Sequence, residues 1–185
     1  DSNYTDALRA VSLSYGNEFI AGQVIKRESN EFLLEQARVF CTKVYEKRDL
    51  LSVKEKIYAN WIYSRYFESP AEQIIYLRQL LNLDDQNPTT HFNLGASYFG
   101  LHQYEQAIAE YEKALEIYSK WGVKPNWIFN YTYLGESYRK TGRFREAKKL
   151  YWHAWRDFRG DPNLILNISL LLLSSENTRL ANRFV

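Results

Sequence analysis

A short residue pattern recurs along the second half of the chain and constrains its fold more than any other feature. The pattern is a Leu-Gly pair, or a similar pair, followed by an apolar residue three positions later. It occurs at Leu94-Gly95 with Tyr98, at Leu134-Gly135 with Tyr138, and at Ile168-Ser169 with Leu172. An alanine follows the first residue of each pair by 13 positions, at 107, 147 and 181. Self-similarity at a period of about 34 residues is typical of a solenoid built from pairs of helices.

The residue types at the repeated positions fit such a helix pair. Gly95 and Gly135 are expected where the two helices of a unit cross closely, because a side chain there would push them apart. Ala107 and Ala147 are small for the same reason on the facing helix. Leucines and tyrosines at the remaining repeated positions, Tyr111 among them, would fill the space between units.

These residues resemble the tetratricopeptide repeat, whose pattern is W-x2-L-G-x2-Y, then A-x3-F, then A. The resemblance implies an all-α fold, a right-handed α-solenoid of antiparallel helix pairs whose concave face binds peptides or protein partners. It is specific over residues 88–185 and degenerate over 52–87. His91 and Tyr131 stand where the repeat has its leading Trp, and six extra residues after Ser119 indicate a longer helix end or loop.

The repeat and the helix-start signals divide the chain into five parts. Ser52 and Ser69 each precede a Glu by three residues, which is the signature of a capping box. We expect a divergent helix pair over 1–51, a degenerate unit over 52–87, a unit with an extended end over 88–127, a full unit over 128–161, and a partial or capping unit over 162–185. The chain contains no Met and stops four residues after Ala181. We therefore expect a segment of a larger regulatory protein, and residues 47–88 look similar to repeat arrays attached to bacterial signalling proteins.

Composition gives a core but little information about partners. Hydrophobic residues make up 45% of the 185 residues, and the net charge of +2 argues neither for nor against nucleic acid. The single cysteine, Cys41, excludes an internal disulfide; it fits a reducing compartment, so we expect a cytoplasmic location. No apolar run approaches the ~20 residues that a membrane span needs.

The sequence offers no constellation for catalysis. His91, His102 and His153 lack a metal-ligating partner at the right spacing, so we expect no metal site. No glycine-rich phosphate loop and no G-x-S-x-G motif are present, and Cys41 in an apolar-periodic helix is typical of a buried hydrophobe. We expect no catalytic residue, no cofactor and no enzyme activity.

The resemblance places a binding surface on the first helix of each unit. The expected partner-binding residues are Thr89, Phe92, Asn93, Ala96, Phe99, Phe129, Thr132, Tyr133, Glu136, Arg139 and Lys140. Exposed Phe92, Phe99 and Phe129 would form an apolar strip with a basic end, which suits an extended peptide with apolar anchors and an acidic group. The alternative is that neighbouring units cover these rings. The family's Lys and Asn clamp for a carboxylate is not met, because Phe92 and Ala96 stand at those positions.

Three other functions stay open from the sequence. One is a peptide-sensing module that controls an attached effector domain. Another is RNA binding through residues 139–160, which carry eight Lys/Arg against two acidic residues, interleaved with aromatics. Aromatics at helical spacing are more often core, and the same charges could dock an acidic partner. The third is self-association, because an uncapped last unit exposes apolar surface.

Overall fold

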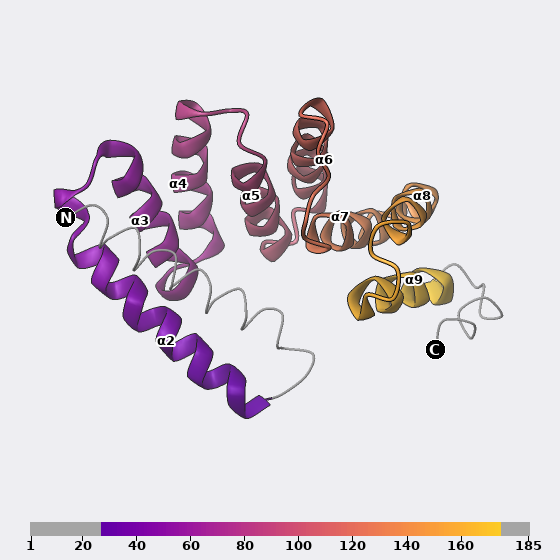
Figure 1. Ribbon diagram of the computed structural model, residues 1–185, viewed down its shortest axis with the longest axis horizontal. Coiled ribbons are helices and arrows are strands. Elements are labelled where there is room, and N and C mark those ends of the chain that lie inside the picture. The colour runs from indigo at the N-terminus through magenta and orange to yellow at the C-terminus, as the bar shows by residue number, and fades with distance from the viewer. Residues whose placement is uncertain (1–26, 175–185) are drawn as a thin grey trace. The chain divides into compact units, whose positions relative to one another are not determined.

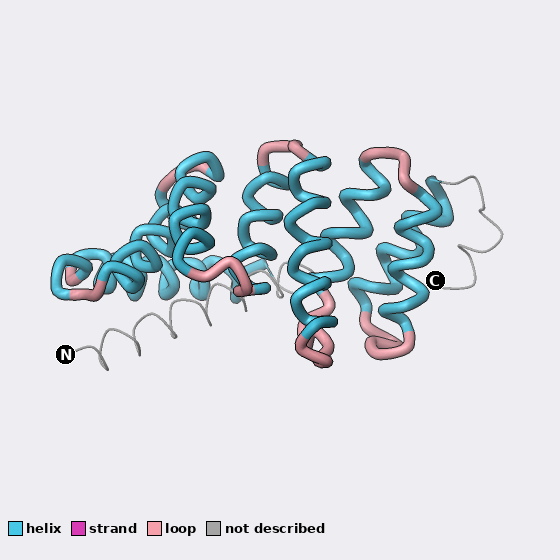
Figure 2. Tube along the Cα trace, turned by 90° about the horizontal axis from the view of Figure 1, so that it is seen from above, coloured by secondary structure: helices cyan, strands magenta, loops and turns pink. Residues whose placement is uncertain are grey.

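The computed structural model describes residues 27–174, and these residues form helices and turns without a strand (Figure 1). They fall into two compact units that divide between Leu83 and Asp84, and each is considered by itself. Figure 2 shows the same path as a tube, with helices joined by short loops. Residues 4–26, which the spacing of Leu8, Val11, Tyr15 and Phe19 predicts to be helical, lie outside the described residues, as does the expected alanine at 181.

The described part of the first unit is a set of antiparallel helices, of which α2 (Arg27–Glu46) comes first. A short 3-10 turn, η1 (Arg48–Leu50), leads to α3 (Val53–Phe67), which packs against both α2 and α4 (Pro70–Leu83). The predicted capping box at Ser52 is confirmed, since its hydroxyl accepts from the Glu55 amide and its own amide donates to the Glu55 carboxylate. Cys41 is buried in α2 as expected.

The second unit contains the clear repeats. Its helices are α5 (Pro88–Gly100), α6 (Tyr104–Lys120), α7 (Phe129–Lys140), α8 (Phe144–Trp155) and α9 (Pro162–Ser174). Each helix packs on the next along the chain, and α7 also contacts both α5 and α9. This is the stacking of antiparallel helix pairs in which the first helices of successive units form one layer. The predicted fold class is confirmed in these residues.

The first helices of the three repeats are α5, α7 and α9, and a side chain caps the N-terminus of α5 and of α9. The Asn87 side chain accepts a hydrogen bond from the Thr90 amide at 3.1 Å, and Pro88 occupies the first turn. Asp161 accepts from the amides of Asn163 and Leu164 at 2.8 and 3.1 Å. The sequence also predicts Asn126 as the cap of a helix that starts at Trp127, and this prediction is wrong, because α7 begins at Phe129 and its start has no side-chain cap.

The two repeated glycines lie at the closest approach of their helix pairs, as predicted. The residue that faces each glycine is a tyrosine. A Cβ on Gly95 would lie 2.7 Å from Tyr111 Cδ1 and Cε1, and a Cβ on Gly135 would overlap the Tyr151 ring. Ala107 and Ala147 are also fully buried. The glycine lets a large ring enter the space between the two helices of the unit.

The turns between helices differ from the expectation at one position. Gly142 has φ of +75°, as expected for a helix-ending glycine. The sequence likewise predicts Gly100 as a helix-ending glycine; it is the last residue of α5 but has no positive φ. The left-handed residue in that turn is His102, with φ of +60°. His102 precedes Gly142 by 40 residues and occupies the same place in its unit.

Two departures from the repeat pattern have clear structural roles. His91, at the position of the leading Trp, is buried in α5; its Nδ1 lies 2.6 Å from Glu110 Oε2 and its Nε2 lies 3.0 Å from the Asp85 carbonyl. The six extra residues extend α6 to Lys120 and form the loop to α7. Gly122 turns that loop with φ of +67°, and Pro125 is buried beneath it.

Candidate functional site

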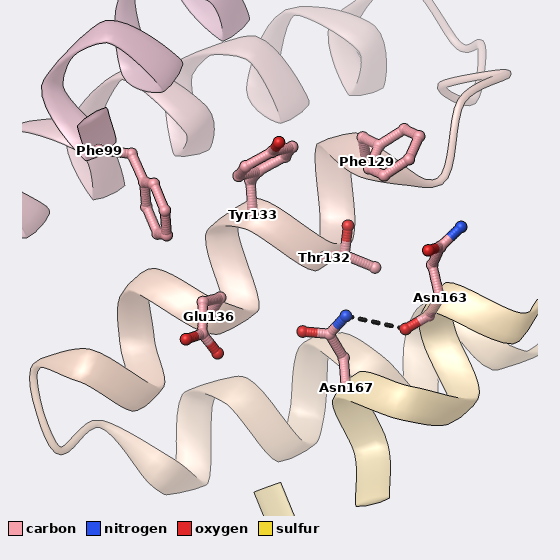
Figure 3. Close-up of a pocket in the computed structure, with 7 residues that line it drawn as sticks. All are labelled: Phe99, Phe129, Thr132, Tyr133, Glu136, Asn163 and Asn167. Carbon is pink, nitrogen blue, oxygen red and sulfur yellow. Dashed lines mark hydrogen bonds between the residues drawn. The ribbon is translucent and has the colours of Figure 1, made fainter. Parts of the chain in front are cut away.

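The first helices of the three repeats in the second unit, α5, α7 and α9, line a hollow of about 150 Å³ that is open to one side. Its lining comes from all three of them, as Figure 3 shows: Phe99 from α5; Phe129, Thr132, Tyr133 and Glu136 from α7; Asn163 and Asn167 from α9. An aromatic wall thus faces a wall of carboxamides across the hollow. We call this site the A-helix hollow.

Tyr133 is the centre of the aromatic wall. Its ring meets the Phe99 ring nearly edge-on at 5.5 Å and 84°, and the Phe129 ring at 5.9 Å. Beneath it, Phe92 and Tyr111 approach the same ring at 6.0 and 6.2 Å. Edge-to-face contacts in this range are stabilising beyond simple burial. The partly exposed rings of the wall therefore rest on a packed aromatic support.

The carboxamide wall is held from behind by α8. The buried Tyr151 hydroxyl donates to Asn167 Oδ1 at 3.1 Å, and Asn167 Nδ2 donates to the Asn163 carbonyl at 2.8 Å. Burial raises the pKa of Tyr151 well above its usual range, so the hydroxyl keeps the proton that it donates. The side-chain amide of Asn163 has no hydrogen-bond partner among the described residues. It remains available to a molecule in the hollow.

The charged end of the hollow is largely paired. Glu136 accepts from Arg139 Nε and Nη2 at 2.7 and 2.6 Å, and Lys140 Nζ lies 3.8 Å from the same carboxylate. Arg139 Nη1 also donates to Ser174 Oγ of α9 at 3.1 Å. The hydrogen bond from Arg139 to Glu136 raises the pKa of Arg139 further. The expected basic end is therefore an internal ion pair on α7 with a link to α9.

The structure gathers five of the eleven predicted binding residues around the hollow: Phe99, Phe129, Thr132, Tyr133 and Glu136. The expected exposure of Phe92 is wrong. That ring is 7% exposed, because Tyr111, Trp127 and Tyr133 surround it. The other five residues do not line the hollow: Thr89, Asn93, Ala96, Arg139 and Lys140.

Sequence reasoning missed Asn163 and Asn167. They lie on the last, partial unit, for which no binding residues were considered. A signal was present, because they repeat the positions of Phe129 and Tyr133 after 34 residues. The same register would have placed them opposite the aromatic wall.

The described residues also bear on the alternatives. They contain no group of three His, Cys, Asp or Glu residues that could hold a metal ion. Burial raises the pKa of the Cys41 thiol to about 12, which keeps it unreactive. Within the basic stretch, Tyr151 is core, and Arg143 pairs with Glu105 at 2.5 Å, while Trp152 is 42% exposed. None of the described helices is both long and apolar enough to cross a bilayer.

Comparison with known proteins agrees with this architecture. The tetratricopeptide repeat family matches residues 86–154. A Podosopora anserina protein of nearly identical TPR-like repeats, assigned as a kinesin light chain, superposes with a TM-score of 0.67 at 13% identity, over 98% of this chain and 92% of that one. The crystal structure of MamA gives 0.62 at 17% identity, over 85% and 87%. At such identities the likeness shows the fold alone. No curated protein matches the sequence significantly.

Proposed function

Because residues 86–154 match the tetratricopeptide repeat in both sequence and fold, we propose that this chain is a non-enzymatic scaffold that holds a peptide or protein partner. The contact site is the A-helix hollow. The observation that carries the proposal is that an aromatic wall lies across one hollow from the side-chain amide of Asn163, which has no hydrogen-bond partner among residues 27–174. Arrays of this repeat are generally non-enzymatic, which supports the role of a scaffold.

The partner that fits best is an extended segment with one large apolar side chain. That side chain would rest against Phe99, Tyr133 and Phe129, which already contact one another and lose little freedom on binding. The Asn163 amide both donates and accepts, so it can bond a backbone peptide group of the same segment. A peptide that offers both a free backbone group and an apolar side chain to the hollow must be unfolded or part of a loop, because the backbone groups of a helix or sheet are already hydrogen-bonded.

The pairing of Arg139 with Glu136 changes the expected peptide chemistry. The sequence favoured an acidic group next to the apolar anchor, but the guanidinium is already occupied by an internal carboxylate. A peptide carboxylate would have to displace Glu136 and would leave that group without its partner. The proposed ligand is therefore apolar and uncharged where it meets the hollow.

The test uses peptides selected from a random display library against the full chain. Affinity is measured for the wild type, for Phe99→Ala and for Phe144→Ala, which removes an exposed ring at the start of α8, away from the hollow. We expect Phe99→Ala to weaken binding at least about tenfold, as truncation of an anchor contact does. Phe144→Ala should change it less than about twofold. Equal affinity of the wild type and Phe99→Ala, with helicity intact, would contradict the proposal.

A further inference from the structure

A second cavity of the second unit, of about 360 Å³, is lined by α6, α7, α8 and the loop that joins α6 to α7. The loop forms one side of it through Gly122, Val123, Lys124 and Pro125. All four belong to the six residues that this unit has beyond the usual repeat length, so a repeat of ordinary length would lack this side. We call this site the loop pocket. It shares no lining residue with the A-helix hollow.

Contacts at both ends hold the loop in this position. Gly122 turns the chain with φ of +67°, and the Val123 amide donates to the Tyr118 carbonyl of α6 at 3.1 Å. Lys124 Nζ donates to Asp157 Oδ1, just beyond the end of α8, at 2.5 Å. The loop is thus linked to α6 at its start and to the end of α8 further on. The pocket therefore needs little ordering when a ligand binds.

Tyr131 of α7 contributes a buried polar group to the loop pocket. The residue is 3% exposed, and its ring packs against the rings of His153 and Phe158, with centroids 6.1 and 5.8 Å away. Its hydroxyl has no hydrogen-bond partner among residues 27–174. Burial raises the pKa of Tyr131, so the hydroxyl keeps a proton to donate. A buried hydroxyl without a partner costs free energy that a ligand in the pocket can recover.

The preceding repeat satisfies the equivalent polar position within the chain. His91 precedes Tyr131 by 40 residues, and its two ring nitrogens lie within hydrogen-bond distance of the Glu110 carboxylate and the Asp85 carbonyl. The equivalent of Glu110 is Leu150, which lines the loop pocket and has no polar side-chain atom to offer Tyr131. The same position is therefore closed in one repeat and borders a cavity in the next.

We propose that the loop pocket binds a small uncharged molecule with an apolar, ring-sized body and one amide or carbonyl group. The volume of the pocket falls in the range of about 300–1,000 Å³ that is usual for small-molecule sites. The Tyr131 hydroxyl donates to the carbonyl oxygen. Ser119 and His153 also line the pocket, and their side chains have no hydrogen-bond partner among the described residues, so they can bond the rest of the amide.

The other lining residues favour a ligand without a charge. Leu115 of α6 and Leu150 of α8 supply apolar surface on two sides of the pocket. Lys124 is already paired with Asp157, so a ligand carboxylate would compete with Asp157 and a ligand ammonium would compete with Lys124. The ligand contacts α6, α8 and the loop together, so its binding stabilises the folded unit. This property is separate from peptide binding in the A-helix hollow.

The first test titrates the full chain with three probes that differ in one group: 3-phenylpropanamide, 3-phenylpropanoate and 3-phenylpropylamine. Binding is followed in nitrogen-proton correlation spectra through the backbone amides of Gly122 and Val123. We expect the amide to bind with a dissociation constant on the order of 1 mM, which is usual for a molecule of this size. The acid and the amine should bind at least about fivefold more weakly. Absence of a saturable shift with the amide, or equal affinity for all three probes, would overturn the proposal.

The second test locates the bound amide with three variants. Tyr131→Phe removes only the hydroxyl, so it should weaken binding about fivefold and leave the stability of the free chain unchanged or slightly higher. Ser119→Trp places a large ring at the pocket and should abolish binding. Asn126→Trp adds the same ring at an exposed loop residue that does not line the pocket, and it should bind like the wild type. Wild-type affinity in Tyr131→Phe or in Ser119→Trp would contradict the assignment.

Discussion

The ring of Tyr151 on α8 occupies the space that a Cβ atom on Gly135 of α7 would need. The same relationship joins Tyr111 and Gly95 one unit earlier. Both tyrosines are 1% exposed, so each ring is a central part of its core. The tyrosine ring can therefore pack at this position only because the facing residue is a glycine, and the same pair occurs in both repeats.

Gly135→Ala is expected to destabilise the second unit by about 1–3 kcal/mol, because the new methyl group must displace a buried ring. Urea unfolding followed by circular dichroism measures the change. The double variant Gly135→Ala/Tyr151→Leu separates the overlap from other effects, since a smaller side chain makes room for the methyl. A double variant that loses the full sum of the two single changes would show that the ring is not the obstacle.

His102→Gly is expected to stabilise the chain by about 1 kcal/mol. His102 has φ of +60°, a conformation that costs an L-residue energy and a glycine nothing. The substitution also removes the hydrogen bond between His102 Nδ1 and Tyr104 Oη at 2.8 Å, which is exposed and contributes little. Gly142→Ala, the reverse change at the equivalent position, should destabilise by a similar amount. Equal stabilities in urea would show that the turn is unstrained.

Two equivalent tyrosines should respond differently to loss of their hydroxyl groups. Tyr151→Phe removes the donor to Asn167 and should cost about 1 kcal/mol. The buried Tyr111 hydroxyl has no hydrogen-bond partner among the described residues, so Tyr111→Phe should be neutral or stabilising. The difference comes from one position on the first helix of the following repeat. That position is Asn167 for Tyr151, but it is Tyr133 for Tyr111. Urea midpoints of the two variants test the contrast, and equal losses would contradict it.

Stability should fall at alkaline pH. Burial raises the pKa of Tyr111, Tyr138 and Tyr151 above the ordinary value of 10.0, and a hydrogen bond to Glu112 adds to the effect at Tyr138. The folded state thus keeps protons that the unfolded chain releases above pH 10. The contribution of these tyrosines to the free energy of unfolding is therefore complete below pH 10 and is lost as the pH rises above it. Free energies of unfolding between pH 8 and 11 test this, with tyrosinate absorbance as the probe. A flat profile would contradict it.

The fold could be predicted because its signal is repeated. Gly95, Gly135 and the alanines after them recur with type and spacing together, and a solenoid reuses one packing solution in every unit. The left-handed conformation of His102 could not be predicted from the sequence. Glycine usually takes that conformation at the end of a helix, so the nearby Gly100 was the expected position.

The candidate site could be predicted only in part. Phe99, Phe129 and Tyr133 were found from their place on the first helices, but so was Phe92, whose burial depends on the loop that brings Trp127 over it. A periodic pattern gives the face of a helix and not what a neighbouring loop covers. Pairing of Arg139 with Glu136 depends likewise on side-chain geometry that sequence spacing leaves open.

Nitrogen-proton correlation spectra of the ¹⁵N-labelled chain test the central claim most directly, because they contain the side-chain amide of Asn163 and the indole of Trp152 together. The Asn163 signal is assigned by its loss in Asn163→Asp. On addition of a selected peptide, we expect the Asn163 amide to shift in proportion to binding, while the indole of Trp152 on α8 stays in place. An unchanged Asn163 amide with a shifted Trp152 indole would contradict the account and place the partner on the basic helix instead.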